Sequence, residues 1–328
     1  MEVSQYKNKK IFQIAKILYV TLILFALLTV ATYTWFDLTT APSVNDMSIY
    51  INSTHGMELS LDRDSEDWST QIDFKSLIKE NIPLVPITYS QADNCFFTTV
   101  YGADGRIASI SQKIDAFSDK APITNNGYYL KVSFYARSGQ DVSVFLSPAT
   151  EVGEGVMGAG TWLVGTPIWN SESIKHDNGG GGAEYAMRVG INITKINMQG
   201  QNTENPVFYI YEPNYDKHLG GQTGYIETFA LNGNSLINKE NHILQTTSTW
   251  RDADIVQKNV IISSLGKFDK EPYLFDLSPE EMAQIDLYFW LEGQDIDCNN
   301  LLNESALILS SIQFDSKAEG SSGLVQIS

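Results

Sequence analysis

The residue types that could do chemistry in this chain include four histidines. They are His55, His176, His218 and His242. None begins the His-Glu-x-x-His pattern that places two imidazoles and a glutamate base on one helical face in zinc proteases. The sequence also lacks a Gly-x-Ser-x-Gly elbow and a phosphate-binding Gly-Lys-Ser/Thr loop. We therefore expect no catalytic residue, no enzyme activity and no cofactor.

Closely spaced acids suggest a weak calcium site near the C-terminus. Asp295, Asp297 and Asn299 place oxygen atoms at alternate positions, as calcium-binding loops do. An EF-hand is excluded, because Asn300 and Ala306 stand where its sixth and twelfth positions need glycine and glutamate. A looser calcium site is one interpretation, and an Asx-rich turn before the last strand is the other.

Aromatic side chains offer a second kind of chemistry, because a flat exposed ring can stack on a sugar. Tyr135, Tyr288 and Trp290 fall on the polar faces of predicted strands and are the candidate ligand-stacking residues. A carbohydrate-binding module is therefore an alternative function. In the competing interpretation, a second sheet or a neighbouring subunit covers that face.

The two cysteines, Cys95 and Cys298, fit no metal-binding spacing. In an exported protein they could form a disulfide that closes a very long loop. Two separate buried thiols are the alternative, and the sequence does not decide between them.

The elements that must position these residues have the period of strands. Residues 128–137 and 285–292 alternate apolar and polar side chains, which predicts strands with one buried and one solvated face. The same alternation covers residues 184–193. Shorter strands are expected at 47–51, 142–146, 207–211, 256–262 and 307–314. Ser278-Pro279-Glu280-Glu281 has the pattern of a helix start and predicts one of a few short helices.

The N-terminus has the composition of an export segment. Four lysines precede an apolar run, namely Lys7, Lys9, Lys10 and Lys16. The run covers residues 17–30 without a charge, and small residues follow it, as in a signal peptide. If residues 32–36 are counted, the run approaches the roughly 20 residues that span a bilayer. Residues 1–34 are therefore expected to form a hydrophobic helix that is either a cleaved signal or a retained membrane anchor.

Charge and composition exclude some function classes. The 328 residues carry 22 basic and 39 acidic side chains, a formal net charge of −17. Such a chain repels nucleic acid and anionic lipid, so we expect no nucleic-acid partner. Hydrophobic residues make up 43% of the chain, which is enough to build a sizeable core.

The segment from Val30 to Asp62 resembles the start of the TasA/camelysin-type surface and biofilm-matrix proteins of Gram-positive bacteria, which depend on the signal peptidase SipW. Residues 32–37 (TYTWFD) fit the junction at the end of the family's leader, and residues 59–61 (LSL) fit a following strand. The resemblance implies cleavage between Thr34 and Trp35, although Thr34 stands where family leaders usually carry alanine. It also implies a jelly-roll-like sandwich, export and polymerisation.

Polymerisation in such proteins is thought to use a donated N-terminal strand, which completes the open sheet edge of the next subunit. Here the donor would run from Trp35 to Val44 and include Phe36 and Leu38. The expected partners are thus further copies of the chain, other surface or matrix proteins, polysaccharide in the alternative reading, and the membrane if the leader is retained.

Taken together, the sequence predicts an all-β, jelly-roll-like antiparallel sandwich with long loops and a few short helices. The sandwich is expected over residues 35–314, after the N-terminal segment 1–34 and before a disordered tail at 315–328. The expected function is that of an exported structural protein at the cell surface or in the extracellular matrix. A membrane-anchored module that binds carbohydrate or a partner is the alternative.

Overall fold

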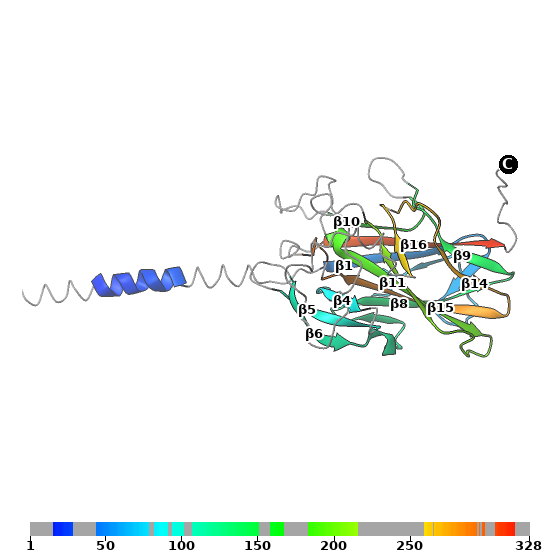
Figure 1. The fold of residues 1–328 in the computed structure, drawn as a ribbon, viewed down its shortest axis with the longest axis horizontal. Coiled ribbons are helices and arrows are strands. Elements are labelled where there is room, and N and C mark those ends of the chain that lie inside the picture. The colour runs from blue at the N-terminus through cyan, green and yellow to red at the C-terminus, as the bar shows by residue number, and fades with distance from the viewer. Residues whose placement is uncertain are drawn as a thin grey trace, which may run out of the picture.

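The computed structural model describes residues 16–28, 44–78, 82–90, 94–101, 107–150, 158–166, 183–215, 259–264, 266–293, 295, 297–298 and 306–318. Over these residues the protein is mostly β, with strands gathered in three sheets (Figure 1). The prediction of an all-β, sandwich-like protein is confirmed at this level. The jelly-roll connectivity stays a prediction.

The first sheet brings the two ends of the described β-region together at its centre. Its strand order is β14 (Tyr273–Leu277), β9 (Val142–Leu146), β16 (Ala306–Ala318), β1 (Val44–Ser53) and β3 (Gln71–Asp73). A further strand, β10 (Trp162–Thr166), also pairs with β16. β1 and β16 run parallel over the whole length of β1, whereas the other pairs in this sheet are antiparallel.

The second sheet lies beneath the first in Figure 1. Its order is β13 (Val260–Ile262), β12 (Val207–Glu212), β11 (Met187–Asn197), β15 (Glu281–Leu291), β8 (Leu130–Ser138) and β2 (Met57–Ser60), and β7 (Ile123–Asn125) pairs with β8. β12 and β13 are parallel. Together with the pairing of β1 and β16, this parallel pair departs from the antiparallel sandwich that the sequence predicted.

The main core fills the space between these two sheets. Alternate residues of each strand point inward, so β1 contributes Ile49 and Ile51 while β15 contributes Leu287 and Phe289, all fully buried. The predicted apolar faces of β8 and β15 both lie in this core. Period-2 alternation therefore identified the inward face of the second sheet correctly.

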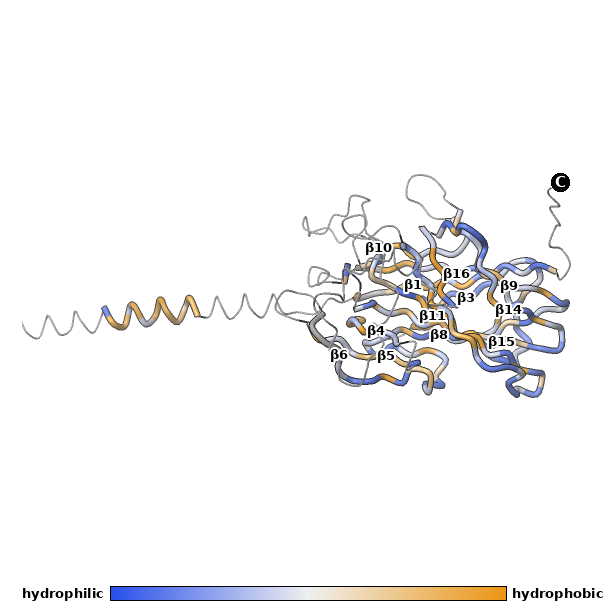
Figure 2. Tube along the Cα trace, in the orientation of Figure 1, coloured by the Kyte–Doolittle hydropathy of each residue, from blue (hydrophilic) through white to orange (hydrophobic). Residues whose placement is uncertain are grey.

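A third sheet covers the opposite face of the second one. It consists of β4 (Ile87–Ser90), β5 (Cys95–Tyr101) and β6 (Ile107–Ile114), and the short helix η1 (Ala116–Ser118) follows it. Aromatic side chains of this sheet and of η1 pack on those of the second sheet: the rings of Phe96 (β5) and Trp290 are 5.1 Å apart, and those of Phe117 (η1) and Tyr288 are 5.4 Å apart. The molecule thus has three β-layers with two apolar interfaces. Figure 2 shows hydrophobic and hydrophilic residues interspersed along the strands.

Three local predictions from the sequence are wrong. Residues 278–280 form the turn between β14 and β15, where the backbone N–H of Glu281 bonds to the carbonyl of Ser278, rather than the start of a helix. Residues 183–186 form a short helix, α2 (Ala183–Ala186), so the strand predicted at 184–193 begins only at Met187. The strand β16 continues to Ala318, because residues 314–318 pair with β9, so the predicted tail begins at least four residues too early.

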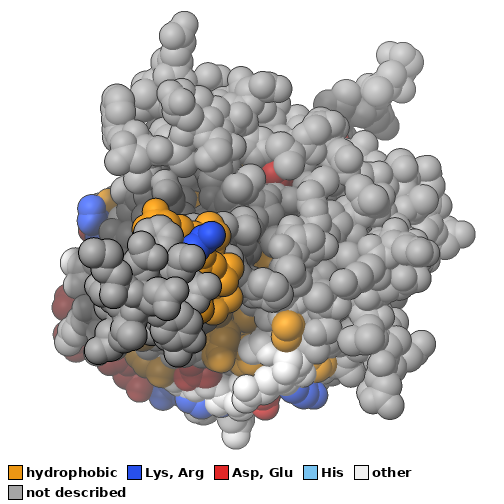
Figure 3. Space-filling model, turned by 90° about the vertical axis from the view of Figure 1, so that its left-hand side faces the viewer, with side chains coloured by type: hydrophobic (Ala, Val, Ile, Leu, Met, Phe, Trp, Pro, Cys, Tyr) orange, Lys and Arg blue, Asp and Glu red, His pale blue; other side chains and the backbone are white. Residues whose placement is uncertain are grey.

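The N-terminal helix stands apart from the sheets. Residues 16–28 are helical, and their apolar side chains are exposed, from 41% for Ile23 to 70% for Phe25. Figure 3 shows hydrophobic side chains exposed on the side of the molecule from which this helix projects. Within the described ranges, no helix combines the length and the apolar character needed to cross a membrane.

Candidate functional site

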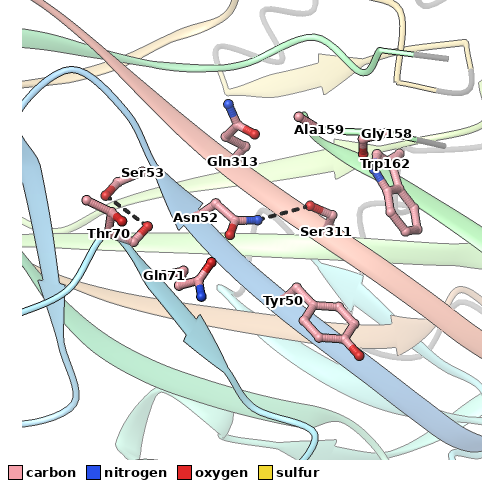
Figure 4. Close-up of a pocket in the computed structure, with 10 residues that line it drawn as sticks. All are labelled: Tyr50, Asn52, Ser53, Thr70, Gln71, Gly158, Ala159, Trp162, Ser311 and Gln313. Carbon is pink, nitrogen blue, oxygen red and sulfur yellow. Dashed lines mark hydrogen bonds between the residues drawn. The ribbon is translucent and has the colours of Figure 1, made fainter. Parts of the chain in front are cut away.

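The outer face of the first sheet carries a groove of about 380 Å³. Its floor is formed by outward-facing residues of β1 and β16, and its walls come from the start of β3 and from the segment that leads into β10 (Figure 4). Ten of the described residues line it: Tyr50, Asn52, Ser53, Thr70, Gln71, Gly158, Ala159, Trp162, Ser311 and Gln313. None of them carries a charge.

The register of the sheet arranges two aromatic side chains around a small one. Ser311 of β16 is paired with Tyr50 of β1 on one side and with Trp162 of β10 on the other. Residues directly opposite in neighbouring strands project from the same face, so Tyr50, Ser311 and Trp162 form one row across the sheet. Strands lie about 4.8 Å apart, which places the two aromatic residues roughly 10 Å apart with the serine between them.

Two residues further along the strands, the register produces a row of three amides. Asn52 of β1 is paired with Gln71 of β3 and with Gln313 of β16. An amide group offers both donors and an acceptor. The groove therefore presents an aromatic row and, roughly 7 Å further along the strands, a row of neutral hydrogen-bonding groups.

Local hydrogen bonds hold part of this arrangement in place. The amide oxygen of Gln313 accepts the backbone N–H of Gly160 at 2.8 Å, and the indole N–H of Trp162 donates to the Gly158 carbonyl at 2.8 Å. The amide nitrogen of Asn52 is 3.5 Å from the Ser311 hydroxyl. By contrast, the side chain of Gln71 is exposed and makes no hydrogen bond with the described residues. The groove thus combines side chains that are held by hydrogen bonds with one, Gln71, that has no such bond to the described part of the chain.

Sequence reasoning missed this groove, although one signal for it was present. The alternation that buries Met47, Ile49 and Ile51 places Tyr50 on the outer face, where it is 37% exposed. Trp162 could not be found in the same way, because β10 was not predicted and its pairing with β16 joins residues about 150 positions apart.

Two of the three predicted ligand-stacking residues lie inside the protein. Tyr288 and Trp290 are 1% and 0% exposed, because the third sheet covers the face of β15 from which they project. The prediction that Tyr288 and Trp290 stack on a ligand is therefore wrong, and the competing interpretation, in which another sheet covers that face, is confirmed. The third residue, Tyr135, is half-buried, and burial raises its pKa.

The predicted calcium loop instead supplies a counter-ion to a buried arginine. One carboxylate oxygen of Asp295 lies 2.5 Å from the guanidinium of Arg188, and its other oxygen accepts the backbone N–H of Asp297 at 2.9 Å. Glu212 approaches the same guanidinium at 3.2 Å. Burial works to lower the pKa of Arg188, but these carboxylates outweigh it and raise the pKa above its ordinary value. The calcium interpretation is not supported, since Asp295 is committed to this ion pair.

Both cysteines are free thiols in the structure, so the disulfide alternative is not the one observed. Cys95 lies in β5 and Cys298 follows the buried Asp297, and both are buried. The Cys298 sulfur is 3.1 Å from the hydroxyl oxygen of Tyr101. Burial raises the pKa of the Cys298 thiol well above its ordinary value, although this hydrogen bond acts in the opposite direction.

One described histidine takes part in a polar contact at the end of β1. The Nδ1 atom of His55 lies 2.5 Å from a carboxylate oxygen of Asp315, which also accepts the Thr54 hydroxyl at 2.5 Å. Burial would raise the pKa of Asp315, but the bonds from Thr54 and His55 outweigh it and lower the pKa. His55 is itself exposed, so this contact joins the β1–β2 turn to β16 rather than forming a cleft.

Several predicted site residues lie outside the described residues. They are Thr34 and Trp35 of the cleavage site, Phe36 and Leu38 of the donor strand, and Asn299. The histidines His176, His218 and His242, for which no role was predicted, also lie outside the described residues. Within the part of the chain that the structure describes, no cluster of three or more His, Cys, Asp or Glu side chains could hold a metal ion.

Comparison of the chain with models of known protein families, with curated proteins and with solved structures finds no match.

Proposed function

We propose that this protein is exported and serves as a structural β-sandwich protein at the cell surface or in the extracellular matrix. The observation that carries the proposal is the helix at residues 16–28, whose apolar side chains are exposed while the sheets have a closed core of their own. An apolar helix of this kind is stable when lipid covers it, or it is removed after export. The lysine-rich flank that precedes it supports the orientation expected of an export segment.

The composition of the rest of the chain agrees with a surface role. A net charge of −17 keeps an abundant exported protein soluble and limits nonspecific association. The resemblance of residues 30–62 to the TasA/camelysin-type leaders, with their jelly-roll subunits, supports the same proposal. We assign the protein no catalytic role.

Self-assembly by strand donation is part of this proposal. The strand β6 forms one edge of the third sheet, and no described strand pairs with its outer side. Such an edge is a row of backbone groups that a donated strand can complete. The donor is the segment that starts at Trp35, and the acceptor is β6 of the next copy.

The test of export is to identify the N-terminus of the protein in the cells that produce it. Intact mass and N-terminal sequencing are measured separately for the cytosolic, membrane, wall and medium fractions. A new N-terminus near Trp35 in the wall or medium is the expected result for a released subunit, and a full-length chain in the membrane is expected for an anchored one. Full-length protein confined to the cytosol would contradict export.

The test of assembly compares two forms of the purified protein by light scattering and electron microscopy. A form that starts at Trp35 should polymerise, and a form that starts at Val44, which lacks the donor segment, should stay monomeric. A proline at Ser111 of β6 should also block assembly, because proline disrupts the pairing of a new strand at this edge. Equal behaviour of the Trp35 and Val44 forms would contradict strand donation.

The alternative function, binding of carbohydrate or a partner, was predicted at the polar faces of β8 and β15 and is instead supported by the groove on the first sheet. The predicted residues Tyr288 and Trp290 are buried, whereas the groove on the first sheet has uncharged, aromatic and amide side chains. That observation favours carbohydrate over a charged partner.

A further inference from the structure

The groove on the first sheet has the chemistry of a site for an uncharged, hydroxyl-rich ligand. The protein as a whole carries a net charge of −17, yet none of the described side chains that line the groove is charged. An ionic ligand would leave its charge unpaired there, which is costly once water is displaced. The lining side chains are instead amides, hydroxyls and two aromatic rings, all of which suit a ligand that is neutral and polar.

The aromatic row can pack on the apolar face of a ring-shaped ligand. Tyr50 and Trp162 flank Ser311, whose small side chain leaves the space between them open (Figure 4). The bond from the Trp162 indole N–H to the Gly158 carbonyl fixes the tryptophan ring in advance. A preset aromatic surface loses little conformational entropy when a ligand binds.

The amide row lies where the hydroxyl groups of such a ligand would reach. Gln313 is held by the Gly160 N–H, so its position does not depend on a ligand. Asn52 stands at the centre of the row, and Gln71 is exposed and makes no hydrogen bond with the described residues. Each amide can both donate to and accept from a hydroxyl group, which is itself a donor and an acceptor.

We propose that this groove binds a neutral saccharide, either free or as a unit of an uncharged polysaccharide. Tyr50 and Trp162 pack against the C–H faces of a pyranose ring, and Asn52, Gln71 and Gln313 bond to its hydroxyl groups. The volume of about 380 Å³ is at the small end of ligand pockets, and its open shape suits an internal unit of a longer chain.

This inference deepens the alternative function, the binding of carbohydrate, and does not depend on the proposed structural role. Export is tested by the location and N-terminus of the protein, whereas saccharide binding is tested on the purified full-length chain. Either proposal can fail while the other stands.

The test is affinity electrophoresis of the full-length protein in native gels that contain laminarin, galactomannan or soluble starch, with alginate as the charged counterpart. At least one neutral polysaccharide should retard the wild-type protein. Trp162→Ala and Tyr50→Ala should each weaken binding roughly tenfold or more, as expected for aromatic anchors. Gln71→Ala should weaken it roughly fivefold, the value of one net hydrogen bond, without any change in folding.

The matched control is Tyr273→Ala, which removes a 48% exposed aromatic residue of the same sheet that does not line the groove. It should leave retardation unchanged. Competition with the constituent monosaccharide then shows how many sugar units the groove needs. If the free sugar competes, the groove binds a single ring; if it does not, the groove needs a longer chain. The proposal would be overturned if no neutral polysaccharide retarded the protein, if only alginate did, or if Gln71→Ala and Trp162→Ala, both folded, bound like the wild type.

Discussion

At the scale of single residues, the more polar face of β15 is buried rather than facing solvent. Asp286, Tyr288 and Trp290 alternate with core residues and were expected on a solvated face, yet all three are buried. The alternation of one strand reports that two faces differ, but it does not report whether another layer covers the more polar face. The strands that cover this face include β4 and β5, which come almost 200 positions earlier in the chain, so the sequence of β15 alone could not predict its burial.

Trp290 should therefore matter for stability rather than for binding. Replacing it with alanine should lower the free energy of unfolding by about 3–5 kcal/mol, because a fully buried indole is lost and a cavity remains. Urea unfolding followed by circular dichroism measures the change. Trp162→Ala is the matched control, since this half-buried tryptophan lies at the groove and should cost much less. Equal costs for the two variants would contradict the third-layer packing.

Arg188 should be the most sensitive charged residue of the described fold. It is 1% exposed and paired with Asp295 and Glu212, so Arg188→Ala leaves buried carboxylates without their cation. We expect a loss of about 3–5 kcal/mol in the free energy of unfolding. The control is Arg63→Ala, which breaks an exposed ion pair with Asp64 and should have no measurable effect. A mild phenotype for Arg188→Ala would show that this ion pair is not buried as described.

The two cysteines should behave as inaccessible free thiols. Ellman's reagent should detect two thiols per chain in denaturant and almost none in the native protein, because both sulfurs are buried and burial raises the pKa of Cys298. The purified full-length protein is measured without reductant. If no thiol appears in denaturant, Cys95 and Cys298 are oxidised and the disulfide alternative is restored.

At the scale of elements, most strands could be predicted and their partners could not. The sequence pattern placed β9 at its observed bounds and found the central parts of β1, β8, β12, β15 and β16. It did not predict β10, or the parallel pairing of β1 with β16, because register depends on contacts between distant segments. The groove depends on that register, since its two rows exist only when β1, β3, β10 and β16 are aligned as they are.

The end of β16 offers a test at this scale. A chain that ends at Phe314 loses the pairing of residues 315–318 with β9 and the contacts of Asp315 with Thr54 and His55. Its free energy of unfolding should fall by a few kcal/mol, at about 1 kcal/mol for each lost hydrogen bond. A chain that ends at Ala318 keeps these contacts and should unfold like the full-length protein. If both truncations were equally stable, the predicted tail boundary at residue 314 would be right after all.

At the scale of the whole molecule, the functional proposal rests on the composition and on the N-terminal pattern. The fold adds the groove on the outer face of the first sheet. The all-β class followed from strand periodicity, while the third layer and the saccharide groove needed the structure. An exposed apolar helix before a sandwich with its own core is the arrangement expected of an exported domain. Such a domain is either anchored to the membrane by the helix or released when the helix is cleaved off. The central claim is therefore that the sandwich lies outside the cell.

The most direct test is to label intact producing cells with a membrane-impermeant amine reagent and to map the modified lysines by mass spectrometry. Lys75 and Lys120 are exposed on the sandwich and should be labelled without lysis, whereas Lys131, which is 2% exposed, should react only after unfolding and serves as the internal control. Labelling of Lys75 and Lys120 on intact cells is the result that export predicts. Labelling that appears only after the cells are lysed would contradict it.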